Sequence, residues 1–166
     1  MIKILEPMMS EIHEEAVTTR RILERVPGDK LSWRPHPKSM SLGQLALHIA
    51  TVPGNISKLA QLEEFEVPAT FSQPAPSDKQ EVMTTLDAGL KAAEEYLSGV
   101  SETAVMGTWR LKSKGKEMFN LPRIGLLRTL MLNHWYHHRG QLSVYLRLLD
   151  VPVPVVYGPT ADEAPF

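Results

Sequence analysis

The chain has 166 residues, enough for one compact domain over residues 1–166 with a sizeable buried core. Hydrophobic residues (43%) and charged residues (22%) are in ordinary globular proportion, and the formal net charge of −1 argues against a nucleic-acid-binding protein and against a polybasic membrane anchor. Cysteine is absent, which excludes disulfides, thiolate metal ligands and a thiol nucleophile supplied by the protein itself.

The first half of the chain predicts two helices separated by a loop. Residues 7–26 carry apolar side chains at helical spacing, whereas residues 29–40 hold two closely spaced prolines and should be irregular. Ser41 and Gln44 match a capping box, in which the two residues cap the start of a helix reciprocally. The helix that they open should continue to Leu59.

This second predicted helix carries a histidine on its apolar side. The apolar stripe consists of Leu45, His48, Ile49, Val52, Ile56 and Leu59. Pro53 and Gly54 should kink or interrupt the helix, because proline removes one backbone hydrogen bond.

The middle of the chain predicts one more helix between two irregular stretches. Residues 66–76 contain three prolines and should form a long loop. A start that resembles a capping box at Ser77 opens a helix to about Leu97. Residues 101–120 suggest an irregular segment or a hairpin.

The longest predicted helix runs over residues 122–149, and residues 150–166 form an extended proline-rich tail. Four helices, each with one apolar face, predict an all-α four-helix bundle. No apolar run approaches the ~20 residues of a membrane span, and residues 1–10 do not resemble a signal peptide. A cytoplasmic protein without a membrane partner is therefore expected.

Three of the six histidines lie within residues 133–141, whose sequence is NHWYHHRGQ. His134 and His138 are four residues apart, so both side chains lie on one face of a helix. The apolar stripe of this helix consists of Leu127, Met131, His134, His138, Gln141, Tyr145 and Leu148. His137 is an alternative partner for His134, but the pair formed by His134 and His138 lies on the longer apolar seam.

A histidine pair of this kind can share one metal ion, and His48 on a facing helix can supply a third ligand. Three protein ligands leave coordination positions open, as in catalytic zinc sites, where the metal lowers the pKa of bound water. The alternatives are a core histidine at position 48 that bonds a backbone carbonyl, and a buried hydrogen-bonded cluster without metal. His13 and His36 are expected on the surface or in a loop. Arg139 could be solvated, or could pair with an acidic residue or an anionic ligand.

Three segments in this order resemble the DinB/YfiT-like superfamily of DinB-like metalloenzymes: residues 45–50 (LALHIA), residues 133–141, and residues 156–163 (VYGPTADE). The resemblance implies an up-down-down-up four-helix bundle and a divalent metal, zinc or nickel, held by His48, His134 and His138. His137 is then an additional neighbour. Relatives are frequently homodimers, and some use mycothiol, bacillithiol or glutathione in transferase or isomerase reactions.

Two classes of function follow as expectations. In the first, the metal activates a low-molecular-weight thiol or water for reaction with a small-molecule substrate, as in an S-transferase or a hydrolase. In the second, the chain is a non-catalytic, metal-stabilised module for binding or dimerisation. The substrate, and a further catalytic residue, cannot be derived from the spacing of the residues.

Overall fold

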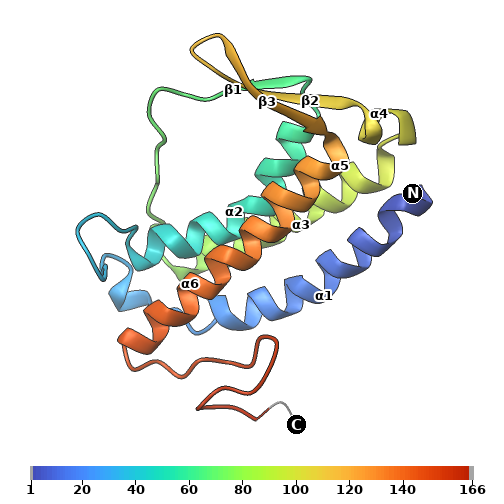
Figure 1. Cartoon of the computed structure of the whole chain (residues 1–166). Helices are drawn as coiled ribbons and strands as arrows, with labels where there is room; N and C mark the ends of the chain where they lie inside the picture. The colour runs from blue at the N-terminus through green and yellow to red at the C-terminus, as the bar shows by residue number, and fades with distance from the viewer. Residues whose placement is uncertain (1, 165–166) are drawn as a thin grey trace.

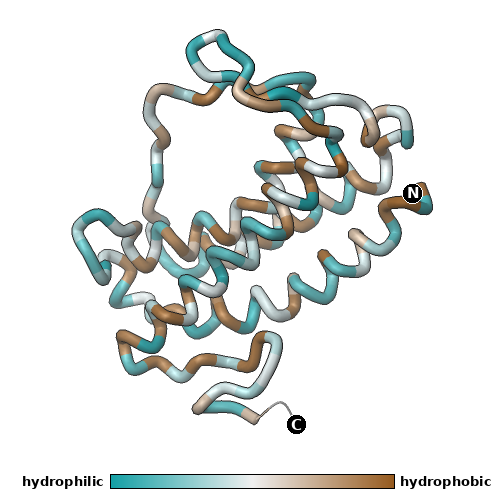
Figure 2. Tube along the Cα trace, viewed as in Figure 1, coloured by the Kyte–Doolittle hydropathy of each residue, from teal (hydrophilic) through white to brown (hydrophobic). Residues whose placement is uncertain are grey.

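The computed structural model describes residues 2–164, which form a mostly helical fold with a small sheet at one end (Figure 1). The long helices are α1 (Glu6–Leu23), α2 (Leu42–Ala60), α3 (Lys79–Gly99) and α6 (His134–Leu148). Helix α2 packs against α3 and α6, and α1 also contacts both α3 and α6. Hydrophobic and hydrophilic residues alternate along these helices, so each helix turns an apolar side inward (Figure 2).

The sheet shows that the expectation of an all-α fold is wrong. Strands β2 (Thr108–Ser113) and β3 (Lys116–Pro122) form an antiparallel hairpin after the short helix α4 (Glu102–Met106), and β1 (Glu64–Glu66) pairs in parallel with β2. The hairpin suggested by the sequence is present, and its turn places Lys114 and Gly115 at φ 51° and 73°. Strand β1 is only three residues long, too short to give an alternating pattern.

The sheet is joined to the C-terminal end of α2. The fully buried indole of Trp109 on β2 donates a hydrogen bond to the carbonyl oxygen of Leu59 at 3.0 Å. Arg123 donates from Nε to the carbonyl of Ala60 and from Nη2 to that of Leu62, both at 3.0 Å. These donors satisfy carbonyls that a helix end leaves without intrahelical partners, and they hold the sheet over the end of α2.

Helix α2 begins as expected and continues through Pro53 without interruption. Ser41 and Gln44 form both hydrogen bonds of the capping box. The expected interruption is absent, and Gly54 lies where α2 meets α3: a Cβ atom at Gly54 would lie 2.9 Å from the Cα atom of Gly89. The glycine therefore serves close helix packing.

The last helical stretch is continuous but changes its winding. It consists of α5 (Arg123–Leu126), a π-helical segment (Leu127–Asn133) and α6. A π-helix has more residues per turn than an α-helix. The side of the helix that the apolar residues before His134 occupy therefore cannot be extended into α6 by counting at α-helical spacing. Consequently, Leu142 and Leu146 are buried, whereas Gln141 and Leu148, which were expected on the apolar seam, are exposed.

The C-terminal segment that follows α6 contains no helix or strand through residue 164. It is held against the helices by charged side chains. Asp162 pairs with Arg147, while Glu163 pairs with Arg21 at 2.8 Å and with Arg25 at 2.5 Å. The last two residues of the predicted tail, 165–166, lie outside the described residues. Among the described helices, none is long and apolar enough to cross a membrane.

Candidate metal centre

The structure brings His48, His134 and His138 together, and we call them the histidine cluster. The Nε2 atom of His134 lies 2.9 Å from Nε2 of His48 and 3.1 Å from Nε2 of His138. One ring nitrogen from each of the three histidines lies within 4.8 Å of the other two, so the cluster could hold a metal ion. His48 comes from α2, and the other two come from successive turns of α6.

The spacing of these nitrogens suits a divalent metal. A zinc–nitrogen bond is about 2.0–2.1 Å long, so two nitrogens on one tetrahedral or octahedral ion lie ~2.9–3.4 Å apart. The two separations from Nε2 of His134, 2.9 and 3.1 Å, fall in this range. Because all three donors are imidazoles, the ligand set is of the kind that zinc and nickel accept.

Burial keeps the cluster uncharged. Burial, followed by the neighbouring histidines, lowers the pKa of His48 and of His134 to about 4. Burial also lowers the pKa of His138, although its hydrogen bond to Gln141 acts in the opposite direction. At neutral pH the three imidazoles are therefore uncharged, each with one ring nitrogen free of a proton, which is the form that binds a metal.

A hydrogen bond between α2 and α6 sets the position of the cluster. Pro53 has no backbone N–H, so the carbonyl of Ile49, four residues earlier, receives no helical hydrogen bond from that position. The buried indole of Trp135 donates to this carbonyl instead, at 3.0 Å. Since Ile49 follows His48 and Trp135 follows His134, this bond ties together the two helical turns that carry the facing histidines.

Gln141 orients the third histidine. Its Oε1 atom lies 2.8 Å from Nδ1 of His138 and can only accept, so Nδ1 carries the proton and Nε2 keeps a free lone pair toward the cluster. The Nε2 amide of Gln141 donates to Nε2 of His137 at 3.0 Å. His137 is exposed and lies outside the group of nitrogens that could share one ion. It contacts the cluster through Gln141 and through its ring, which lies edge-on to that of His138.

Arg139, whose role the sequence left open, is only 1% exposed and forms an ion pair with Glu15 of α1 at 2.5 Å. It also donates to Thr19 at 3.1 Å and to the hydroxyl of Tyr157 in the C-terminal segment. The arginine that follows His138 therefore joins α6 to α1 and to the tail. Its partners identify it as a structural residue.

The two remaining histidines lie apart from the cluster, as expected. His13 is an exposed residue of α1, with its Nε2 atom 3.9 Å from a carboxylate oxygen of Glu94. His36 lies in the loop before α2, where its Nδ1 atom accepts a hydrogen bond from the backbone of Lys38 at 3.2 Å.

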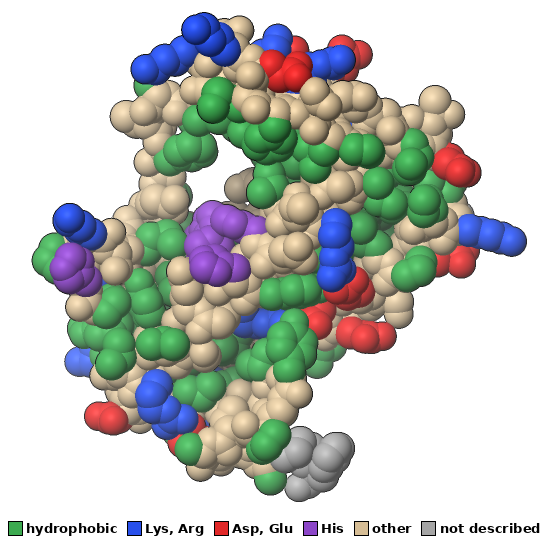
Figure 3. All heavy atoms as spheres, viewed as in Figure 1, with side chains coloured by type: hydrophobic (Ala, Val, Ile, Leu, Met, Phe, Trp, Pro, Cys, Tyr) green, Lys and Arg blue, Asp and Glu red, His purple; other side chains and the backbone are tan. Residues whose placement is uncertain are grey.

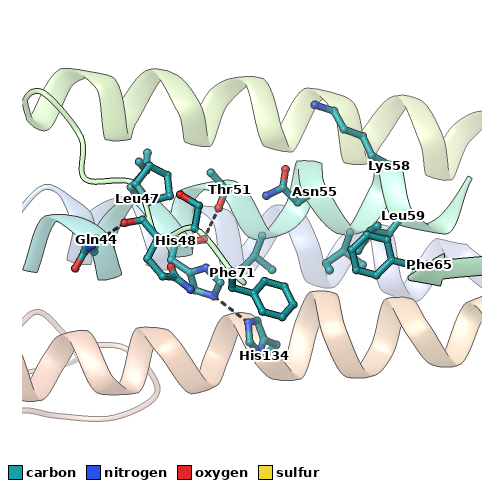
Figure 4. A pocket seen from close by; sticks show the side chains of 15 residues that line it. Gln44, Leu47, His48, Thr51, Asn55, Lys58, Leu59, Phe65, Phe71 and His134 are labelled. Atoms are coloured by element: carbon teal, nitrogen blue, oxygen red, sulfur yellow. Dashed lines mark hydrogen bonds between the residues drawn. The ribbon is translucent and has the colours of Figure 1, made fainter. Parts of the chain in front are cut away.

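A cavity of about 480 Å³ adjoins the histidine cluster, and we call it the α2 pocket. Its apolar lining consists of Leu47, Val52, Ile56, Leu59, Phe65, Phe71 and Pro74. His48 and His134 line the cavity (Figure 4), whereas His138 is not among its lining residues. On the molecular surface the histidines lie beside an opening bordered by hydrophobic side chains (Figure 3).

Several of the pocket residues were named from the sequence as metal ligands, as a helix cap or as part of an apolar stripe, but the pocket that they line was not predicted. Those on α2 recur every three or four positions around His48, and this spacing is a signal that could have found them. Phe71 lies in the irregular connection between β1 and α3, where no pattern marks it.

Comparisons with known proteins agree on one family. The model of the DinB family matches residues 1–165. An uncharacterised protein, YrdA of Bacillus subtilis strain 168, is 26% identical over 165 residues, covering 98% of this chain and 93% of YrdA. The crystal structure of a DinB-like protein from Bacillus cereus ATCC 10987 matches with a TM-score of 0.65 and 27% identity, over 86% of this chain and 91% of that one. The DinB-like protein YjoA of Bacillus subtilis shares the fold, with a TM-score of 0.69 at 20% identity over 91% of this chain and 97% of that one.

Proposed function

Because the chain belongs to the DinB family, we propose that it is a metal-dependent enzyme in which His48, His134 and His138 hold one divalent ion, zinc or nickel. The observation that carries this proposal is the convergence of three uncharged imidazoles on one point at the edge of a cavity. A structural metal is usually enclosed by four protein ligands, whereas this cluster offers three from the described residues. Two of the three also line an open pocket.

A divalent ion bound there supplies Lewis acidity, which lowers the pKa of a thiol or of water. The chain's own residues provide the ligands and their orientation. Gln141 holds the Nδ1 proton of His138, and Trp135 sets the distance between the turns of His48 and His134. The chain has no cysteine, so in a thiol reaction the thiol is a separate low-molecular-weight molecule.

The test of this function is a screen of the zinc-loaded and nickel-loaded protein against mycothiol, bacillithiol and glutathione. A ligand that binds only the folded state raises the unfolding temperature. We expect one of the thiols to stabilise the metal-loaded protein and to be conjugated to an electrophile such as monochlorobimane. The matched control is His134→Ala, which should lose both effects. Conjugation that is unchanged after metal removal would refute the proposal.

The competing function is a non-catalytic, metal-stabilised module for binding or dimerisation. The α2 pocket favours the enzyme, because a purely structural metal needs no adjoining cavity. Metal binding that stabilises the fold without any effect of thiols or other small molecules would favour the module instead.

We also infer the assembly that the family resemblance implies. The four long helices would form an up-down-down-up bundle, and two chains would form a homodimer. Contacts of α2 with α3 and α6 support the first inference. Val144 and Leu148, one turn apart on α6 and each 57% exposed, are apolar residues that a second chain could cover. Analytical ultracentrifugation that finds only monomer at micromolar concentration would refute the dimer.

A further inference from the structure

The α2 pocket has one wall of regular structure and one of irregular chain. The wall on α2 runs from Gln44 past His48 to Leu59, so the cavity extends along the helix away from the histidine cluster. At the far end, Phe65 of β1 closes it. His48 lies nearer to Gln44 than to Phe65 along this cavity, and His134 lies on α6 beside Phe71 (Figure 4).

The opposite wall belongs to the connection between β1 and α3, residues 67–76. A hydrogen bond attaches this connection to the rest of the protein near each of its ends. The backbone N–H of Val67 donates to the carbonyl of Lys112 at 2.8 Å, extending the pairing of β1 with β2. Near the other end, Nε2 of Gln44 donates to the carbonyl of Gln73 at 2.6 Å. Gln44 thus caps α2 with its oxygen and holds the connection with its nitrogen.

Phe71 lies between these two attachments and is 65% exposed. Its ring lies beside His134 and faces Leu59 and Phe65 across the pocket (Figure 4). Most of the surface of this ring meets water. An apolar ligand that covers the ring removes apolar surface from water, which makes binding more favourable.

The scarcity of charged side chains in the lining also favours an uncharged, apolar ligand. Among the described residues that line the pocket, none is acidic, and Lys58 is the single charged side chain. Lys58 is itself exposed, on the turn of α2 that carries Leu59. A cavity of about 480 Å³ is in the range of small-molecule sites, which are mostly apolar with a few polar groups.

Resting on the function proposed above, we propose that the substrate has an uncharged, apolar body of aromatic character. This body fills the α2 pocket against Phe71, with one metal-binding atom beside His48 and His134. Selectivity then comes from Phe71, Phe65 and the aliphatic side chains of α2, while the histidine cluster supplies the chemistry.

The first test uses a neutral fluorescent probe, N-phenyl-1-naphthylamine, titrated into the metal-free protein. We expect about one probe per chain, and binding about tenfold weaker in Phe71→Ala because the probe loses an aromatic contact. The matched control is Phe119→Ala, which removes a ring that is 45% exposed on β3 and does not line the pocket. This control should bind the probe as the unaltered protein does.

The second test links the pocket to the histidines by displacing the probe from the zinc-loaded protein. Benzyl mercaptan, which has a thiol and an apolar ring, should displace the probe at much lower concentration than 2-mercaptoethanol, which has only the thiol. In His134→Ala the difference between the two concentrations should become smaller, because only the apolar ring of benzyl mercaptan still contributes to its binding. If zinc does not bind, the proposed function fails, yet probe binding that depends on Phe71 would still establish the apolar site.

Three results would overturn the inference. The first is the absence of probe binding, and the second is equal weakening by Phe71→Ala and Phe119→Ala. The third is binding of an anionic analogue, 1-naphthalenesulfonate, that depends on Lys58 and not on Phe71, as tested with Lys58→Met. That result would assign an anionic substrate to the pocket.

Discussion

The hydrogen bond from Trp135 to the carbonyl of Ile49 makes a prediction that involves both helices of the candidate metal centre. Replacing Trp135 by Phe keeps an aromatic ring in the core but removes the N–H donor. The carbonyl of Ile49 is then left without a partner, because Pro53 has no N–H to offer. Leaving a buried polar group unsatisfied costs about 1–3 kcal/mol. The smaller ring adds a packing loss of about 1 kcal/mol.

The total expected loss in the free energy of unfolding is therefore about 2–4 kcal/mol. Pro53→Ala provides the matched background, since alanine at position 53 donates the helical hydrogen bond to Ile49 itself. In that background Trp135→Phe should cost only the packing loss of about 1 kcal/mol. The two substitutions should thus show a coupling energy of about 1–3 kcal/mol, with the double variant more stable than the sum of the single effects predicts.

The assay is urea unfolding of the metal-free protein for all four forms, with the slope of free energy against urea checked for constancy. Trp135→Phe should also weaken zinc binding, because the turns that carry His48 and His134 are no longer held together. Additivity of the two substitutions within about 0.5 kcal/mol would refute the reasoning. So would a Trp135→Phe variant as stable as the unaltered protein.

Three further predictions concern neighbouring groups. Because the pKa values of His48 and His134 are lowered to about 4 in the folded chain, whereas an unfolded histidine titrates near ~6.5, the unfolded state binds more protons between these values. The melting temperature of the metal-free protein should therefore fall from pH 7 to pH 5, and His134→Gln should reduce this fall; an equal fall in both would contradict the assignment. Glu15→Gln leaves buried Arg139 without its counter-charge and should lower the free energy of unfolding by about 3–5 kcal/mol in urea titrations without changing metal stoichiometry. Gln141→Leu removes the acceptor that orients His138, and isothermal titration should show zinc affinity about 10–100-fold lower at nearly unchanged melting temperature; unaltered affinity would exclude the orienting role.

The helices could be predicted because their signals are local. The capping box of Ser41 and Gln44 marks the start of α2 to the residue, and the first helix, expected over residues 7–26, is found as Glu6–Leu23. The third helix begins one residue later than its capping signal suggested, because Asp78 rather than Ser77 caps it. These features depend on hydrogen bonds between residues near in sequence.

The remaining features depend on tertiary contacts. Pro53 interrupts nothing because Trp135, more than eighty residues later, supplies a donor to the carbonyl that it leaves free. Strand β1 exists only because β2 pairs with it, and the π-helical segment shifts the phase of α6. A helical wheel drawn from the sequence alone contains neither effect.

The histidine cluster likewise depends partly on local spacing and partly on tertiary contacts. The spacing of His134 and His138 predicted that they lie on one face, and their convergence with His48 required α2 and α6 to pack side by side. His137, an alternative partner by spacing, is exposed and bonded to Gln141. The wall of the α2 pocket that contains Phe71 could not be predicted, because this irregular connection is placed by Gln44 and by the sheet.

The central claim is that three histidines bind one divalent metal ion, and metal content measured by mass spectrometry after equilibration with zinc or nickel tests it most directly. We expect about one ion per chain in the unaltered protein and in the control His137→Ala. His48→Ala, His134→Ala and His138→Ala should each lose the ion or bind it far more weakly, with circular dichroism confirming that they are folded. Folded histidine-cluster variants that retain one ion per chain, or loss of the ion in His137→Ala alone, would contradict the account.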